Sequence, residues 1–156
     1  MVTKKQLTMI SIGIALAGLL WGINTTEASI DYWLDKNIYF YKGVNFIFVN
    51  CKNGGNADGD FSLIITFTNV TFSNETEYPY NKINENEFSF RFILHKDETA
   101  SKKVYFIVDE NVTSFSISVE AKKTKVWYPE KFNAYYPTLV NYNWSEVEDR
   151  YILLED

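Results

Sequence analysis

The chain has 156 residues, of which 46% are hydrophobic and 17% aromatic, a size that suits one folded domain with a sizeable core. Its formal net charge of −5 and its pI of about 4.9 lack the basic footprint of a nucleic-acid-binding protein. Seven glycines and three prolines exclude a collagen-like or low-complexity chain.

The first predicted element is an apolar segment at residues 7–23, directly after Lys4 and Lys5. A basic region followed by an apolar run is typical of a secretory signal peptide, and the bond after Ala28 offers a cleavage site. The run of 17 residues also reaches the lower limit for a membrane-spanning helix. A cleaved signal peptide and a retained N-terminal membrane anchor therefore both stay open for residues 1–28, with a buried core helix as the least favoured alternative.

Either of the first two alternatives places residues 29–156 outside the cytoplasm, because the lysines precede the apolar run and acidic residues follow it. Residues 29–37 form a juxtamembrane segment or a first short strand. The apolar stretches at 38–41 and 44–51 predict one bulged strand or two short strands. A turn rich in Gly, Asn and Asp follows at residues 53–60.

Residues 61–72 carry the clearest strand pattern in the chain. Apolar side chains recur at every second position, and hydroxyl side chains stand among them. In a strand the apolar positions share one face, which is predicted to enter the core. These positions are Phe61, Leu63, Ile65 and Phe67.

The same alternation returns at residues 88–94, 104–108 and 115–121, after a long polar connection at 73–87. A final apolar run at 151–154 is either the closing strand or a segment that pairs with another molecule. With turn signals between these runs, the sequence predicts an all-β fold, a single antiparallel Ig-like β-sandwich of about seven strands that follows an N-terminal hydrophobic helix.

One turn and its flanking strands resemble a known family. The strand, turn and strand around residues 50–67 are similar to the opening of archaeal and bacterial extracellular Ig-like repeats of the CARDB kind, and residues 102–108 and 115–120 are similar to the later strands. The resemblance covers about residues 38–121 and departs at the C-terminal end, where the family's acidic closing motif is missing. It implies a fibronectin III/CARDB-like sandwich, a setting in cell-surface adhesion or assembly, and no catalytic residue. The residues that carry it are Asn53, Gly55, Asp58, Gly59, Phe61, Leu63 and Ile65.

Catalytic and metal chemistry find little support in the sequence. His95 is the only histidine, and its neighbours are typical of a solvated turn, so we expect no catalytic residue and no cofactor. Cys51 is the only cysteine, which excludes an internal disulfide and favours a small core residue. Asn56, Asp58 and Asp60 alternate in a loop and are weak candidates for a cation, because the pattern fails where a calcium loop needs its first and last ligands.

Two kinds of exposed site are predicted. Four Asn-x-Ser/Thr sequons lie outside the N-terminal segment, so the candidates for glycosylation are Asn69, Asn74, Asn111 and Asn143. The C-terminal segment is rich in aromatic residues, which either close the sandwich or bind a partner. The binding candidates are Trp127, Tyr135, Tyr136 and Trp144.

The sequence as a whole favours a non-enzymatic extracytoplasmic protein, secreted or anchored through residues 7–23. We expect it to act by protein–protein contacts in a cell-surface assembly, as a filament subunit, a filament anchor or a surface-layer partner. The alternative is a carbohydrate-binding module that uses the exposed C-terminal aromatic residues. A row of exposed rings favours sugar binding, and buried rings favour assembly.

Overall fold

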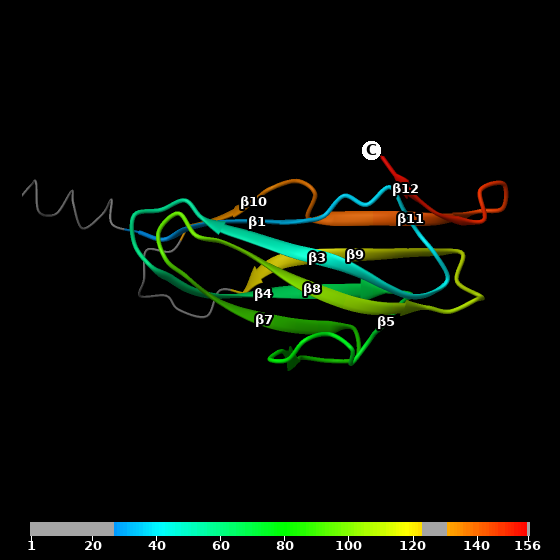
Figure 1. Ribbon diagram of the computed structural model, residues 1–156, viewed down its shortest axis with the longest axis horizontal. Helices are drawn as coiled ribbons and strands as arrows, with labels where there is room; N and C mark the ends of the chain where they lie inside the picture. Colours follow the sequence, from blue (N-terminus) through cyan, green and yellow to red (C-terminus); the bar gives the residue numbers. More distant parts are fainter. Residues whose placement is uncertain (1–26, 123–130, 156) are drawn as a thin grey trace, which may run out of the picture.

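The computed structural model describes residues 27–122 and 131–155. These residues form two β-sheets that face each other, so the predicted all-β sandwich is confirmed (Figure 1). The predicted N-terminal helix lies outside the described residues. Among the described residues, none belongs to a helix long and apolar enough to cross a membrane.

The first sheet has five strands in the order β10-β1-β3-β8-β5. The pair formed by β1 and β10 is parallel, and the other pairs of this sheet are antiparallel. Its strands are β1 (Ser29–Leu34), β3 (Gly43–Asn53), β5 (Thr71–Phe72), β8 (Thr99–Val108) and β10 (Lys131–Ala134).

The second sheet has seven strands in the order β2-β12-β11-β9-β4-β7-β6, all antiparallel. Within it, β4 pairs with β7 on one side and with β9, the central strand, on the other. Its strands are β2 (Tyr39–Phe40), β4 (Gly59–Thr68), β6 (Asn81–Lys82), β7 (Glu87–Leu94), β9 (Ser114–Lys122), β11 (Leu139–Ser145) and β12 (Arg150–Leu154).

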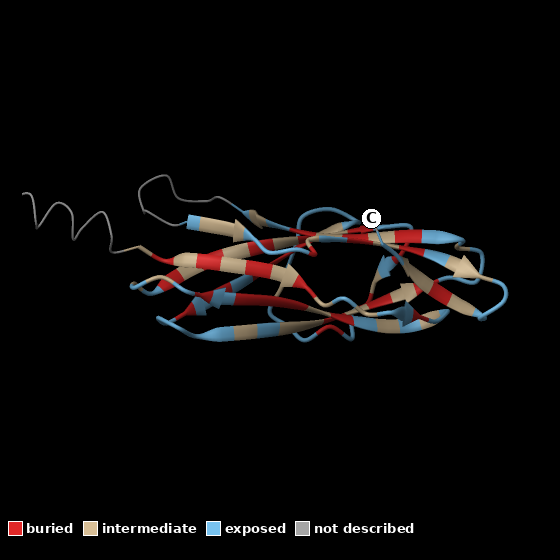
Figure 2. Ribbon diagram, turned by 90° about the horizontal axis from the view of Figure 1, so that it is seen from above, coloured by how far each residue is buried: buried red, intermediate tan, exposed pale blue. Residues whose placement is uncertain are grey.

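The core fills the space between the sheets and follows the period of two that the sequence predicts. Along the strands, buried stretches alternate with half-buried and exposed ones (Figure 2). The four apolar positions predicted for residues 61–67 are all buried, with at most 2% of each side chain exposed. Aromatic rings join the sheets: Phe106 of β8 lies 5.2 Å from Phe40 of β2 and 5.9 Å from Phe67 of β4, measured between ring centroids.

The described residues contain twelve strands, more than the sequence predicts, because two predicted runs are divided between the sheets. Residues 38–51 become β2 in one sheet and β3 in the other. Residues 61–72 become β4 and β5, and the chain changes sheets at Asn69, whose φ of 67° is the left-handed conformation that Asn tolerates best after Gly. The remaining difference lies in the short strands β6 and β10, which form inside stretches that show no alternation, and in the seven-residue β11, where Val140, Tyr142 and Trp144 alternate.

The strand ends define two poles of the elongated sandwich. At one pole, which we call the N-terminal pole, β1 begins beside the β3–β4 and β7–β8 turns (Figure 1). At the opposite pole, the far pole, lie the β8–β9 and β11–β12 turns. The final apolar run is the closing strand β12, which pairs with β11 on one side and with β2 on the other.

Candidate interaction surface

The outer face of the five-stranded sheet carries a patch of apolar and aromatic side chains, which we call the aromatic surface. On β3, Val44, Phe46 and Phe48 alternate with the core residues of the same strand. The register places Val44 opposite Ile107 of β8 and Phe46 opposite Tyr105, so all five side chains share one face. Val44 is 54% exposed and Phe46 is 41% exposed, which makes this a solvent-facing apolar patch.

The rings of the aromatic surface are packed against one another and against a cation. The Phe46 ring lies edge-on to the rings of Phe48 and Tyr105, with 5.8 Å between centroids in each pair. The Lys103 ammonium lies 4.0 Å from the Phe46 centroid and 5.1 Å from that of Tyr105. A positive charge is therefore held over the aromatic rings by a cation–π contact.

The patch continues past the edge of the sheet onto β2. A shallow hollow of about 220 Å³ lies between Tyr39, Val44 and Phe46. The Arg150 guanidinium stacks over the Tyr39 ring at 4.0 Å from its centroid, and so adds a second cation beside the apolar side chains. Although the chain as a whole is acidic, this surface presents apolar groups together with positive charge.

The four predicted aromatic binding residues are found in different places. Tyr135 and Tyr136 follow β10 and are 63% and 67% exposed. They lie beside Trp33 of β1, whose ring centroid is 6.2 Å from that of Tyr135. Trp144 belongs to β11 in the other sheet, where its ring packs edge-on against Tyr151 at 4.9 Å. Trp127 lies outside the described residues.

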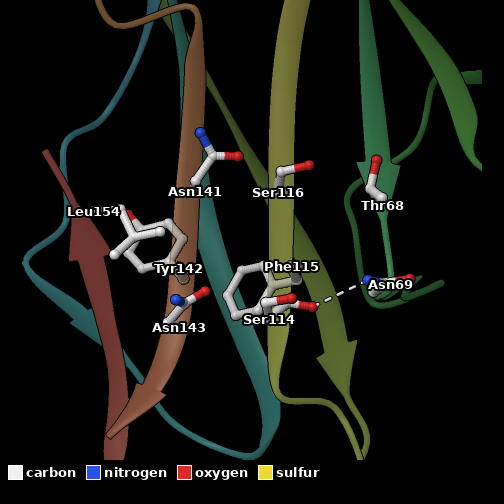
Figure 3. A pocket seen from close by; sticks show the side chains of 9 residues that line it. All are labelled: Thr68, Asn69, Ser114, Phe115, Ser116, Asn141, Tyr142, Asn143 and Leu154. Atoms are coloured by element: carbon white, nitrogen blue, oxygen red, sulfur yellow. Dashed lines mark hydrogen bonds between the residues drawn. The ribbon is translucent and has the colours of Figure 1, made fainter. Parts of the chain in front are cut away.

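The outer face of the seven-stranded sheet is different in character, because hydroxyl and amide side chains dominate it. Near the far pole they surround a hollow of about 220 Å³, where Asn69 and Asn143 lie on opposite sides of Ser114 (Figure 3). The Asn69 side-chain amide donates a hydrogen bond to the Ser114 carbonyl at 3.1 Å. No carboxylate, histidine or amine lines this hollow, so it holds no group for general acid–base chemistry near neutral pH.

The weak cation candidates of the β3–β4 turn are directed to three different partners. The Asn56 side-chain carbonyl accepts the Glu27 backbone N–H at 3.0 Å. Asp60 forms a bidentate pair with Arg91, at 2.8 Å and 2.6 Å. Asp58 lies 3.3 Å from the exposed His95. Within residues 27–122 and 131–155, no three His, Cys, Asp or Glu side chains converge as a metal site would require.

Cys51 lies in the core on the inner face of β3 and is 0% exposed. Its thiol lies 3.6 Å from the Ala100 carbonyl, and burial raises the pKa of Cys51 to about 12. The thiol is therefore protonated at neutral pH and inaccessible to a partner. This placement agrees with the prediction of a small core residue.

An interaction surface on β3 and β8 was not predicted from the sequence, although one signal was present. The run at residues 44–51 is apolar at both odd and even positions, where a half-exposed antiparallel strand normally alternates with polar residues. Such a strand is either covered on both sides or exposes apolar side chains. Only the structure shows that Val44 and Phe46 on the outer side of β3 are exposed.

Comparisons with known proteins give likenesses of fold alone. No family model and no curated protein matches the chain. The sixth cohesin of scaffoldin B from Acetivibrio cellulolyticus is 9% identical with a TM-score of 0.46, and the match covers 69% of this chain and 99% of the cohesin. A non-cellulosomal cohesin from the archaeon Archaeoglobus fulgidus is 11% identical with a TM-score of 0.44, over 80% and 83% of the two chains. The human F-spondin reeler domain is 7% identical with a TM-score of 0.37, over 70% and 91%.

Proposed function

We propose that this chain is a non-enzymatic, extracytoplasmic interaction module that contacts a protein partner in a cell-surface assembly through the aromatic surface. The observation that carries the proposal is the pair of exposed side chains Val44 and Phe46, which lie beside the half-buried Tyr105. The Lys103 ammonium lies over the rings of Phe46 and Tyr105. Tyrosine and phenylalanine are enriched where protein interfaces bury their energetic centre. The lysine-led apolar run before residue 29 and the sequons support the compartment.

The charges at this surface define the partner's chemistry. Lys103 and Arg150 each lie 4.0 Å from the centroid of an aromatic ring of the patch, and Arg150 is already paired with the Glu148 carboxylate at 3.5 Å. A partner that buried the Lys103 ammonium without a countercharge would incur a desolvation penalty. The fitting partner therefore presents an apolar centre with carboxylates at its rim, and association with it weakens as salt is raised.

A pair of variants tests the proposal. Val44→Ser with Phe46→Ser removes the apolar centre of the patch, while Ile93→Ser removes an equally exposed apolar side chain from the outer face of the other sheet. Each protein, purified as the full chain, is used to capture partners from the envelope of the cells that make it, and the recovered protein is then purified for calorimetry. We expect the double variant to lose about 30-fold in affinity for the same partner, and Ile93→Ser to bind unchanged.

Loss of binding in the Ile93→Ser variant alone, or equal binding by all three proteins, would contradict the aromatic surface as the contact.

The intact mass of the protein recovered from its own cells tests the compartment separately. A mass that starts near Ser29 indicates a released subunit, and a mass that retains Met1 indicates a membrane-anchored module.

A further inference from the structure

A second exposed site lies on the same sheet, across the buried Asn50 from the aromatic surface. It is a groove of about 360 Å³ lined by Asp31 and Trp33 of β1, Lys52 of β3, and Tyr135 and Tyr136. The volume falls at the lower end of the range for small-ligand sites. Only the two tyrosines were predicted from the sequence, since the other three residues come from strands about 80–100 positions earlier.

The two tyrosines are held in place by backbone hydrogen bonds. The Tyr135 N–H donates to the Tyr32 carbonyl at 2.8 Å, and the Leu34 N–H donates to the Pro137 carbonyl at 2.8 Å. The segment after β10 therefore continues to follow β1, and the backbone from which both tyrosine side chains project is held against that strand. Tyr136 is 67% exposed, so most of its side chain is free for contact.

Polar groups of both signs stand beside these rings. The Asp31 side chain is oriented by Asn133, whose amide donates to the carboxylate at 2.9 Å. The same amide lies 2.9 Å from the Ser29 hydroxyl, which fixes its own position. Lys52 lies opposite Asp31 in the register of β1 and β3 and is exposed.

We infer that this groove binds a neutral saccharide. A pyranose ring has an apolar C–H face that packs on an aromatic ring, and hydroxyl groups at its edge that both donate and accept hydrogen bonds. Here Trp33, Tyr135 and Tyr136 supply the ring faces, Asp31 supplies an acceptor, and Lys52 supplies a donor. The opposite charges balance, so an anionic or cationic polymer gains nothing over a neutral one.

The same groups disfavour an apolar peptide as the occupant. A purely apolar side chain in the groove would cover the Asp31 carboxylate and the Lys52 ammonium without replacing their hydrogen bonds to water, which costs free energy. Saccharide hydroxyls replace those bonds. The inference is independent of the proposed protein contact, because the two sites share no residue.

The test is calorimetric titration of the full chain with a panel of neutral oligosaccharides: cellohexaose, chitohexaose, laminarihexaose and mannohexaose. We expect at least one to bind with a Kd tighter than about 1 mM. Trp33→Ala and Tyr136→Ala are each expected to raise that Kd by about tenfold or more. Trp33→Tyr, which keeps an aromatic ring, is expected to raise the Kd less than Trp33→Ala does. Tyr78→Ala, which removes a tyrosine that is 76% exposed elsewhere, leaves the Kd unchanged.

No binding by any sugar of the panel overturns the inference, and so does binding that survives both Trp33→Ala and Tyr136→Ala. Thermal unfolding of each variant shows whether the fold is intact. The Val44→Ser/Phe46→Ser protein is expected to bind the sugar normally, so loss of partner binding and loss of sugar binding are separable results.

Discussion

The rings of Trp33 and Tyr135 lie 6.2 Å apart at an interplanar angle of 59°, although the two residues stand near opposite ends of the described chain. The parallel pairing of β1 with β10 brings them together, through a register that places Tyr32 beside Ala134. The groove therefore depends on a long-range strand pair rather than on any local motif.

We predict that Gly55→Ala destabilises the fold. A Cβ at this position would clash with the Glu27 carbonyl oxygen and lie 2.5 Å from the Ser29 nitrogen, and both are backbone atoms that cannot rotate away. We expect the free energy of unfolding to fall by more than about 2 kcal/mol, measured by urea denaturation.

The matched control for this change is Gly54→Ala, where the nearest atom to the added Cβ, an Asp31 carboxylate oxygen, lies 3.9 Å away. This variant is expected to be neutral, or more stable by about 0.4–1 kcal/mol through the less flexible unfolded chain. Equal stability of the two variants would show that residues 27–29 do not pack against this turn.

Asn53→Asp is predicted to destabilise the N-terminal pole. The Asn53 amide is 0% exposed and donates to the carbonyls of Ala57 at 2.7 Å and Leu94 at 3.2 Å. A carboxylate of the same shape has no proton for these acceptors and carries a buried charge instead. We expect the free energy of unfolding, measured by urea denaturation, to be about 2–4 kcal/mol lower than that of the wild type at pH 7. The difference should shrink as the pH is lowered, because the carboxyl then becomes neutral. A loss that does not vary with pH would argue against a buried charge.

Cys51 is predicted to lower the stability of the fold at alkaline pH. Burial raises its pKa to about 12, so the folded state keeps the proton where an unfolded thiol has lost it. Between the pKa of the unfolded thiol and that of the folded thiol, the folded state binds more protons than the unfolded state. The free energy of unfolding therefore falls as the pH rises from about 8.5 to 12. Burial also raises the pKa of Tyr142 and Tyr151, so part of the fall belongs to them.

Denaturation of the wild type and of Cys51→Ala across this pH range isolates the thiol. The variant is expected to show a shallower fall than the wild type. A thiol-specific reagent provides a second measurement: at pH 8 it should modify Cys51 only after the protein unfolds. Rapid modification of the native protein would show that the thiol is accessible.

The sequons lead to a prediction about where glycans attach. All four candidate asparagines are exposed. The hydroxyl residue at the third position of each sequon differs in exposure. Thr76 is 3% exposed and its hydroxyl accepts the Tyr105 N–H at 2.8 Å, Ser145 is half-buried and its hydroxyl accepts the Glu148 N–H at 3.2 Å, and Thr71 and Thr113 are exposed. We therefore expect glycans on Asn69 and Asn111, less on Asn143 and none on Asn74, and intact mass before and after each Asn→Gln change measures them. A glycan on Asn74 would mean attachment before the chain folds.

The core faces of the central strands could be predicted from the sequence, because a period of two needs no knowledge of neighbours. Phe61, Leu63 and Ile65 enter the core as predicted. The length of β8 could not be predicted, since Thr99–Val108 includes polar residues that belong to a strand only because β3 pairs with them over ten residues. Propensity is overridden there by the partner strand.

The candidate sites were predictable only in part, for the same reason. The sequence left open whether the C-terminal aromatic residues close the sandwich or bind a partner, and the structure shows that Tyr135 and Tyr136 are exposed. Their companion Trp33 could not be assigned, because an isolated Trp in a short strand is equally compatible with core and surface. Phe46 and Tyr105 meet across two strands whose pairing is fixed by sheet order rather than by local pattern.

The lateral margins of both sheets end in strands of only two to four residues, namely β2, β5, β6 and β10. Each covers only part of its neighbour, because β5 pairs with two of the ten residues of β8 and β6 pairs with two of the eight residues of β7. In the part of the chain described here, the rest of β8 and of β7 has no partner strand on that side, and such backbone is where a strand from another molecule can add to a sheet. Strand addition at these two margins is therefore a route of assembly that does not use the aromatic surface, and it would depend less on salt than a contact between charged side chains.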